Sequence, residues 1–168
     1  AKRGIASTIR GDGDVFKTRA ITQLERLVRA MLLPEDAGAL RAALAIELLG
    51  FDAWSVRTHS DQLKEVFTDL HGTWMAQGFA SAFHALLHDP QLQLIERALR
   101  LSDGARDLSR MMHASERIQD RESRFVLSPE LTLQWLRERR LETDVETSEE
   151  DEVRPHIDTD AVQGVTVH

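Results

Sequence analysis

The fold class follows from the stretch RAITQLERLVRAMLLP, residues 19–34. Pro34 ends this stretch as a helix, because proline lacks an N–H group and its ring clashes with the preceding turn. The apolar residues before it recur at intervals of three and four, which places them on one helix face: Ile21, Leu24, Leu27, Val28, Met31 and Leu32. The spacing therefore predicts an amphipathic helix over residues 16–33 and a helical domain built on its apolar face.

The same period continues outward and predicts six more helices. The next one covers residues 35–49 and ends at Gly50. Ser60 can cap the one after it, and Gly78 closes that helix because glycine readily adopts a left-handed conformation. The remaining helices are predicted from Phe79 to Leu87 before Asp89-Pro90, from Leu92 to Leu99 before Asp103-Gly104, from Leu108 to Ile118, and from the cap signal Ser128-Pro129-Glu130 to about Arg140.

Both ends of the chain are expected to be strands of a larger sheet. Residues 5–9 alternate in strand fashion, and residues 161–168 are rich in β-branched side chains. The first residue is Ala1 rather than methionine. We therefore expect an excised segment whose terminal strands lie side by side. The predicted fold class is mainly α, a compact bundle of about seven helices with short β-strands at the two termini.

Charge is distributed unevenly along the 168 residues, whose net charge is −7. Residues 1–30 carry seven basic and three acidic side chains, whereas residues 141–168 carry one arginine and nine acids. A uniform basic face is therefore missing from the sequence, and any nucleic-acid contact has to be local.

The composition also excludes some classes of site. There is no cysteine, which rules out disulfides, thiolate metal sites and cysteine nucleophiles. No apolar run approaches the roughly 20 residues of a membrane-spanning helix, and no signal peptide opens the sequence. We expect a cytoplasmic protein with no membrane partner.

The sequence contains no motif of an independent enzyme. It has neither the phosphate loop G-x-x-x-x-G-K-[ST] nor the nucleophile elbow G-x-S-x-G. His84 and His88 have the spacing of metal ligands beside Asp89, but two surface histidines are favoured because no further ligand motif completes a site. Core packing is favoured over base stacking for the three tryptophans: Trp54, Trp74 and Trp135.

Three stretches share their order and spacing with a known family. The first is Val15-Phe16 before an amphipathic helix, then LPE at 33–35, LRAALA at 40–45 and LLG at 48–50. The second is DGARDL at 103–108 with MHASE at 112–116, which is similar to "GERRLT…LHLAEL". The third is DTDAVQGVTVH at 158–168, similar to "ESD…VQIVTIH" at the start of the fifth helicase motif. Together they resemble the large helicase subunit of the RecBCD type, a UvrD-like member of helicase superfamily one.

Two departures from the family pattern concern charge. After Phe16 the family tends to carry acidic residues, whereas this chain has Lys17, Thr18 and Arg19. The Arg-Arg pair of the second stretch is Arg106-Asp107 here.

The resemblance implies an ATP-driven motor that unwinds duplex DNA ends for repair and recombination, often with a nuclease domain. The related AddA-type subunit is the second candidate. This segment then corresponds to the second accessory domain, inserted in the second motor domain between the fourth and fifth motifs. The implied division is a strand and turn of the host motor domain at 1–15, the accessory domain at 16–140, an acidic linker at 141–160 and the strand that begins the fifth motif at 161–168.

The same resemblance implies what the segment binds. It needs no cofactor of its own, since ATP and magnesium bind elsewhere in the parent enzyme. The implied partners are DNA, the remaining motor domains of the parent chain, and RecC-like and RecD-like subunits or an AddB-like subunit. The segment itself is expected to position the motor rather than to catalyse.

The resemblance also implies a weak duplex-DNA contact at Leu49-Gly50-Phe51. In UvrD-like helicases the matching turn is glycine-rich, and a residue without Cβ lets main-chain N–H groups reach phosphate oxygens. Thr166 and His168, at the start of the fifth motif, are the other candidate DNA-contacting residues. Two alternatives stay open: the turn is a plain helix C-cap, or the chain is a stand-alone helical protein-interaction module with no helicase link.

Overall fold

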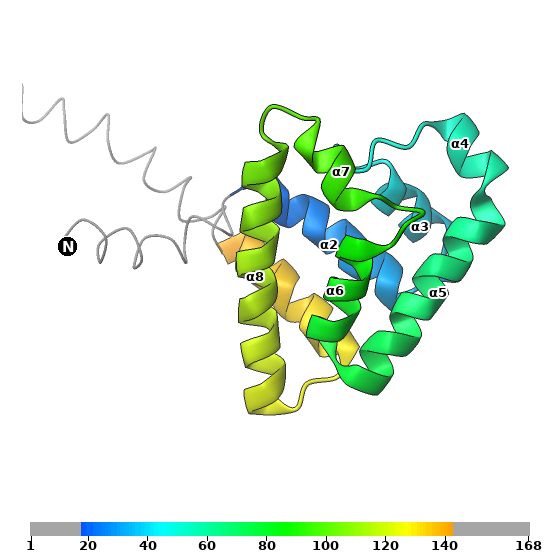
Figure 1. Ribbon diagram of the computed structural model, residues 1–168. Coiled ribbons are helices and arrows are strands. Elements are labelled where there is room, and N and C mark those ends of the chain that lie inside the picture. The colour runs from blue at the N-terminus through cyan, green and yellow to red at the C-terminus, as the bar shows by residue number, and fades with distance from the viewer. Residues whose placement is uncertain (1–17, 143–168) are drawn as a thin grey trace, which may run out of the picture.

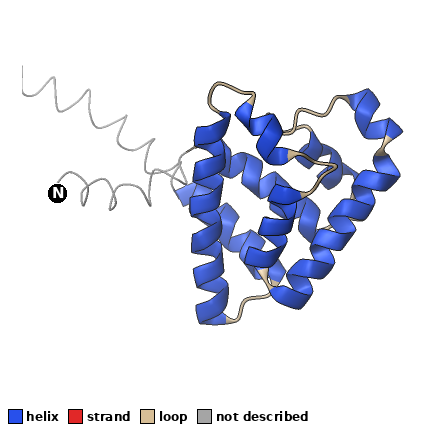
Figure 2. Cartoon of the chain, in the orientation of Figure 1, coloured by secondary structure: helices blue, strands red, loops and turns tan. Residues whose placement is uncertain are grey.

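A computed structural model describes residues 18–142, and this part of the chain consists of helices joined by turns, as Figure 1 and Figure 2 show. Seven of its helices are α2 (Arg19–Leu32), α3 (Ala37–Leu44), α4 (Ala53–Thr58), α5 (Ser60–Gln77), α6 (Phe79–His88), α7 (Leu94–Leu99) and α8 (Gly104–Phe125). One more, called the last helix below, covers residues 129–142.

The mainly helical class is confirmed, with no strand between residues 18 and 142. The terminal strands predicted at 5–9 and 161–168, and their expected pairing, lie outside the described residues. Within that range, no helix combines the length and the apolar character that crossing a membrane requires.

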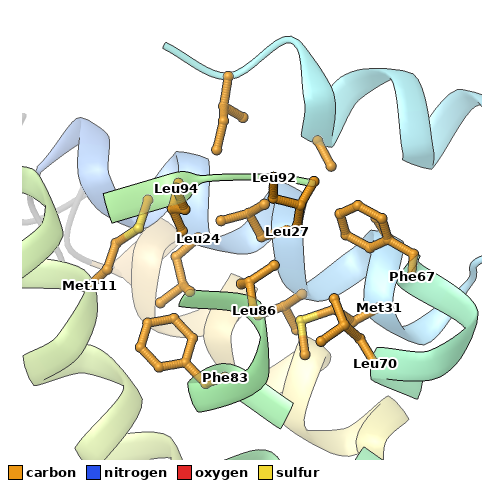
Figure 3. Packing of buried hydrophobic residues seen from close by; sticks show 14 of the residues in the cluster. Leu24, Leu27, Met31, Phe67, Leu70, Phe83, Leu86, Leu92, Leu94 and Met111 are labelled. Atoms are coloured by element: carbon orange, nitrogen blue, oxygen red, sulfur yellow. The ribbon is translucent and has the colours of Figure 1, made fainter. Parts of the chain in front are cut away.

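Helix α2 is central to the core and packs against α3, α5 and α8. All six apolar residues of its predicted stripe are buried. In Figure 3 the side chains of Leu24, Leu27 and Met31 lie among those of other elements: Phe67, Leu70, Phe83, Leu86, Leu92, Leu94 and Met111. Full burial of one such side chain contributes roughly 1.5–3 kcal/mol, so this interior is the main source of stability.

Two predicted helix boundaries are confirmed. Gly78 adopts a φ of +94° between α5 and α6, the left-handed region that a side chain with Cβ disfavours. Ser128 caps the last helix, because its Oγ accepts a hydrogen bond from the Leu131 N–H at 3.4 Å. Pro129 then stands at the first helical position, where a missing N–H costs nothing.

The region before α5 differs from the prediction. Ser60 is the first residue of α5 and not its cap; the N-cap is His59, whose side chain makes no capping hydrogen bond. A short helix, α4, precedes it and was not predicted. Asp52 starts this helix by accepting the Ser55 N–H at 2.7 Å, and Val56 is its one buried residue, so the sequence carries no apolar stripe to reveal it.

The fifth predicted helix begins later than its apolar pattern indicates. Asp89 Oδ1 accepts the N–H groups of Gln91 and Leu92, both at 2.9 Å, and holds them in a turn. Gln93 then adopts a left-handed φ of +49°. Helix α7 therefore starts at Leu94, although Leu92 is fully buried.

Glu122 of α8 joins four helices. Its Oε1 accepts hydrogen bonds from Trp74 Nε1 of α5 at 2.9 Å and from Thr132 Oγ1 of the last helix at 3.0 Å. Its Oε2 accepts the backbone N–H of Phe79 at the start of α6, at 3.0 Å. One carboxylate thus satisfies three donors from three separate elements.

A second carboxylate fixes the last helix to α2. Glu25 of α2 has a side chain only 14% exposed, and it accepts hydrogen bonds from Arg137 Nε at 3.0 Å and Arg140 Nε at 2.7 Å. Charged hydrogen bonds of this kind are shorter and stronger than neutral ones. These two ion pairs therefore attach the last helix to the rest of the bundle.

Candidate nucleic-acid interface

The candidate DNA contact at Leu49-Gly50-Phe51 lies on a turn that follows α3. Helix α3 ends at Leu44, with Ala45 as its C-cap. The predicted helix over residues 35–49 is therefore wrong in its last third, and Gly50 does not end it. Residues 45–49 form turns instead.

Burial explains why the helix stops early. Ile46, Leu48 and Leu49 are all buried, and so is Leu44. On a continued helix, with about 100° per residue, Leu44 and Ile46 would point to nearly opposite sides. A turn lets all of them face the core, and its buried Leu48 N–H is satisfied by the Gln23 Oε1 of α2 at 3.0 Å.

The N–H groups of the candidate turn all have partners inside the domain. The Ile46 carbonyl accepts from Leu49 at 3.1 Å and from Gly50 at 2.7 Å, and the Leu44 carbonyl accepts from Phe51 at 3.1 Å. Gly50 has a φ of +63°, and a Cβ there would lie 3.7 Å from the nearest atom. Glycine is thus favoured here for its backbone conformation and not for space. The DNA contact stays a prediction, but the donors expected to make it are already in use.

Arg97 of α7 completes the turn and was missed by the sequence analysis. Its Nη1 donates to the Leu49 carbonyl at 3.1 Å and its Nε donates to the Leu92 carbonyl at 3.0 Å. Its guanidinium carbon lies 4.3 Å from the centroid of the Phe51 ring. No sequence pattern could pair these residues, because Arg97 and Leu49 are 48 positions apart.

The charges around the turn are mixed. Arg41 and Arg57, which flank it in the sequence, are exposed. Glu47 is also exposed and pairs with Arg19 at 3.0 Å. The hydrogen bond from the Ser55 N–H holds the pKa of Asp52 below its usual value, so that this carboxylate stays ionised beside Phe51. The acids offset the arginines, so the turn has no clear excess of positive charge to attract phosphate.

The other candidate DNA-contacting residues, Thr166 and His168, lie outside the described residues. Their role as DNA contacts therefore stays a prediction.

The histidine pair is a surface feature. His84 and His88 are both exposed, with ring centroids 4.5 Å apart. The neighbouring Asp89 uses Oδ1 to accept two backbone N–H groups. Over the described range, no group of three metal-ligating side chains comes together.

The three tryptophans have different environments. Trp74 is buried in the core, as predicted. Trp135 is partly buried against the core. The core-packing prediction is wrong for Trp54, which is 65% exposed on α4 because that helix buries only Val56.

The second family-like stretch forms the start of α8, and its glycine has a steric reason. A Cβ on Gly104 would lie 1.7 Å from the Ala98 carbonyl oxygen and 2.6 Å from the Ala98 carbonyl carbon. Any side chain there would push α7 and α8 apart. The glycine therefore permits the close approach of these two helices.

The two charge departures from the family pattern meet in space. Asp107, at the position of a family arginine, has a side chain only 3% exposed and accepts a hydrogen bond from Arg19 Nε at 3.1 Å. Arg19 stands where the family tends to carry acids. The basic residue at position 19 and the acidic residue at position 107 thus form an ion pair between α2 and α8, so each unusual charge is neutralised by the other.

Comparison with known proteins supports the resemblance. No family model matches the chain. Curated relatives described as RecBCD enzyme subunit RecB do match it. The protein from Escherichia coli strain K12 is 29% identical over 160 residues, which cover 92% of this chain and 13% of the relative. The protein from Mycolicibacterium smegmatis is 29% identical over 165 residues, 98% of this chain and 15% of the relative.

A third relative of the same description, from Haemophilus influenzae, is 27% identical over 176 residues, which cover 99% of this chain and 14% of the relative. The chain therefore spans only about one seventh of the length of these relatives, although nearly all of it is matched. The similarity to the RecB-type large helicase subunit, indicated by three short motifs, is thus confirmed along almost the whole chain.

Proposed function

We propose that this chain is the second accessory domain of a RecB-type subunit, within an ATP-dependent DNA helicase and exonuclease that processes DNA ends in repair and recombination. The observation that carries the proposal is the similarity over 92–99% of the chain to 13–15% of RecB relatives. Such a match disfavours a stand-alone interaction module, which would have no reason to align from end to end. The RecB description also favours this parent over an AddA-type one.

The role we assign is to position other parts of the parent protein. A positioning domain has to be rigid, and the helices here are tied by Glu122 and Glu25, whose carboxylates accept donors from several elements. ATP and magnesium would bind to the motor domains elsewhere in the parent chain. The proposed partners are those motor domains, DNA, and RecC-like and RecD-like subunits, with an AddB-like subunit as the alternative. The proposed location is the cytoplasm.

A weak duplex contact at Leu49-Gly50-Phe51 is part of the proposal. A substitution that introduces one negative charge at the turn can test it. Gly50→Asp places a carboxylate at the turn, whereas Gly50→Asn places a neutral group of the same shape there; both residues tolerate a positive φ. Duplex binding by the chain at low salt should fall in the aspartate variant only. Equal affinity of the two variants would remove the DNA contact from the proposal.

The assignment to an accessory domain has two direct tests. ATP hydrolysis by the pure chain, with and without single-stranded DNA, should stay at background, since phosphoryl transfer needs a phosphate cradle and bound magnesium. The parent coding sequence should continue after His168 with Ser-Lys-Gly-Leu-Glu, as the fifth helicase motif does. Robust turnover by the chain alone, or an unrelated continuation, would contradict the assignment.

A further inference from the structure

A hollow of about 320 Å³ lies between the C-terminal half of α8 and the last helix. Its walls are rich in arginine and aromatic side chains: Arg117, Arg121, Arg124, Phe125, Trp135 and Arg139. Phe125 is 60% exposed although it ends a well-packed helix. This combination of cations and rings is typical of surfaces that bind anionic chains.

Arg121 lines this hollow beside two aromatic rings. Its guanidinium carbon lies 5.0 Å from the ring centroid of Phe125 and 5.2 Å from that of Trp135. The Nε of Arg121 is buried and has no hydrogen-bond partner among the described residues. An atom so buried is closed to a ligand from outside, so a ligand of Arg121 has to bind the remainder of its guanidinium group, on a side chain that is only partly buried.

The charges of the hollow favour an anion as its ligand. Arg124 Nε binds Asp120 Oδ1 at 3.1 Å, and Arg139 Nη1 lies 3.5 Å from Glu142 Oε2. No acid in the described range is paired with Arg121. The hollow thus carries an excess of positive charge on a chain whose net charge is −7.

We propose that the hollow binds the acidic stretch of this same chain at residues 144–152, with a carboxylate paired to the accessible part of the Arg121 guanidinium group. The stretch contains six acids and no basic residue: Asp144, Glu146, Glu149, Glu150, Asp151 and Glu152. The last helix leads directly into it, and Glu142 already pairs with Arg139 of the hollow. The inference is independent of the proposed function.

The length of the stretch is sufficient. Nine residues span up to about 30 Å when extended, whereas the part of α8 from Arg117 to Phe125 is about 12 Å long. A short tether also gives the stretch an effective concentration on the order of millimolar at the hollow. A nucleic acid would instead have to approach against the nine acids of residues 141–168, so the stretch is the favoured occupant.

The absence of cysteine from the sequence makes a direct test possible. Ser148→Cys gives a single site for a nitroxide spin label on the full chain. At low salt the label should broaden the NMR signals of Arg121 Nε–Hε and of the backbone amides of residues 117–125. The same label on a variant with the six acids replaced by their amides should leave those signals sharp.

Three outcomes would overturn the proposal. One is a lack of broadening at residues 117–125, and another is equal broadening with and without the six acids. The third is broadening in a mixture of spin-labelled unenriched chain with unlabelled ¹⁵N-enriched chain, since a second copy would then be the occupant.

A twelve-residue oligothymidylate distinguishes nucleic acid from the acidic stretch. The proposal expects the six-amide variant to bind this probe at least about tenfold more tightly than the wild type at low salt. Arg121→Gln in the six-amide background should remove the gain while the helical circular dichroism is unchanged. Equal affinity of wild type and six-amide variant would mean that the stretch does not cover the hollow.

Discussion

Arg97 and Arg121 both lie over aromatic rings, yet they belong to regions of opposite character. Arg97 closes the turn after α3, where it donates to two main-chain carbonyls and covers Phe51. Arg121 lies between two rings beside an open hollow, and its Nε has no partner among the described residues. The difference teaches that the turn is a structural junction, whereas the hollow is a surface prepared for a ligand.

The largest loss of stability is expected at Gly104, where α8 packs directly against the backbone of α7. Gly104→Ala places a methyl group against the Ala98 carbonyl, next to Arg97 on α7. We expect the free energy of unfolding to fall by about 3 kcal/mol, the upper end for overpacking, because backbone has to move. Urea unfolding followed by circular dichroism measures this loss.

The matched control for that substitution is Gly72→Ala on α5. A Cβ at Gly72 meets nothing within 4 Å. Alanine is favoured over glycine inside a helix, so stability should rise by about 0.5–1 kcal/mol. A similar loss in both variants would show that the contact with Ala98 is not the cause.

The comparison itself is tested by removing the two guanidinium groups. Arg97→Met loses two charged hydrogen bonds and leaves the Leu49 and Leu92 carbonyls unsatisfied, which should cost about 2 kcal/mol of unfolding free energy. Arg121→Met loses the contacts with the rings of Phe125 and Trp135 and the proposed surface pair with the acidic stretch, neither of which leaves a buried carbonyl unsatisfied, and should cost only about 1 kcal/mol. Equal losses would erase the distinction between the closed turn and the open hollow.

Two ion pairs sharpen the comparison further. A double-mutant cycle of Arg19→Ala and Asp107→Ala should give a coupling of about 1 kcal/mol, because Arg19 is half-exposed although Asp107 is buried. The control cycle uses Arg124→Ala and Asp120→Ala at the hollow, where both side chains are exposed and the coupling should stay at or below about 0.5 kcal/mol. A larger coupling at the hollow would contradict the assignment of the buried pair as the one that fixes α2 to α8.

The smallest effect concerns the cap of α3. The Ala39 N–H, with that of Gly38 and the nearby charge of Arg29, holds the pKa of Asp36 below its usual value. Because the pKa of Asp36 is lower in the folded chain than in the unfolded chain, its ionised carboxylate stabilises the fold at any pH above the pKa of the unfolded chain. This stabilisation is lost as the pH falls through the pKa of the folded chain, so the effect appears below about pH 4. A ¹³C titration of the Asp36 carboxyl should give a midpoint below that of an unfolded aspartate. Asp36→Asn should flatten the acid side of the stability profile, and an unchanged profile would contradict this role.

The sequence predicted the parts of the fold that depend on one element at a time. The stripe of α2, the stop at Gly78 and the cap at Ser128 are local signals, and each was found in the structure. The early end of α3 could not be predicted, because it depends on the buried amide of Gln23 and on Arg97 from a distant helix. Helix α4 was missed because it buries a single residue.

The candidate site shows the same division between local and distant signals. Gly50 was identified from its position, and its left-handed φ agrees with a special backbone role. The carbonyl groups that accept hydrogen bonds from the N–H groups of the turn could not be predicted, since main-chain hydrogen bonds do not depend on residue type. The arginine hollow was missed for a related reason, because α8 and the last helix contribute its residues separately.

The central claim is that these helices position a motor without providing its chemistry. It is tested most directly in the parent subunit, with residues 18–142 replaced by a short glycine–serine linker. The account predicts that hydrolysis of ATP stimulated by single-stranded DNA survives this deletion while unwinding of duplex ends is largely lost. Loss of the ATPase in a folded deletion variant, or unwinding at the full rate without these helices, would contradict it.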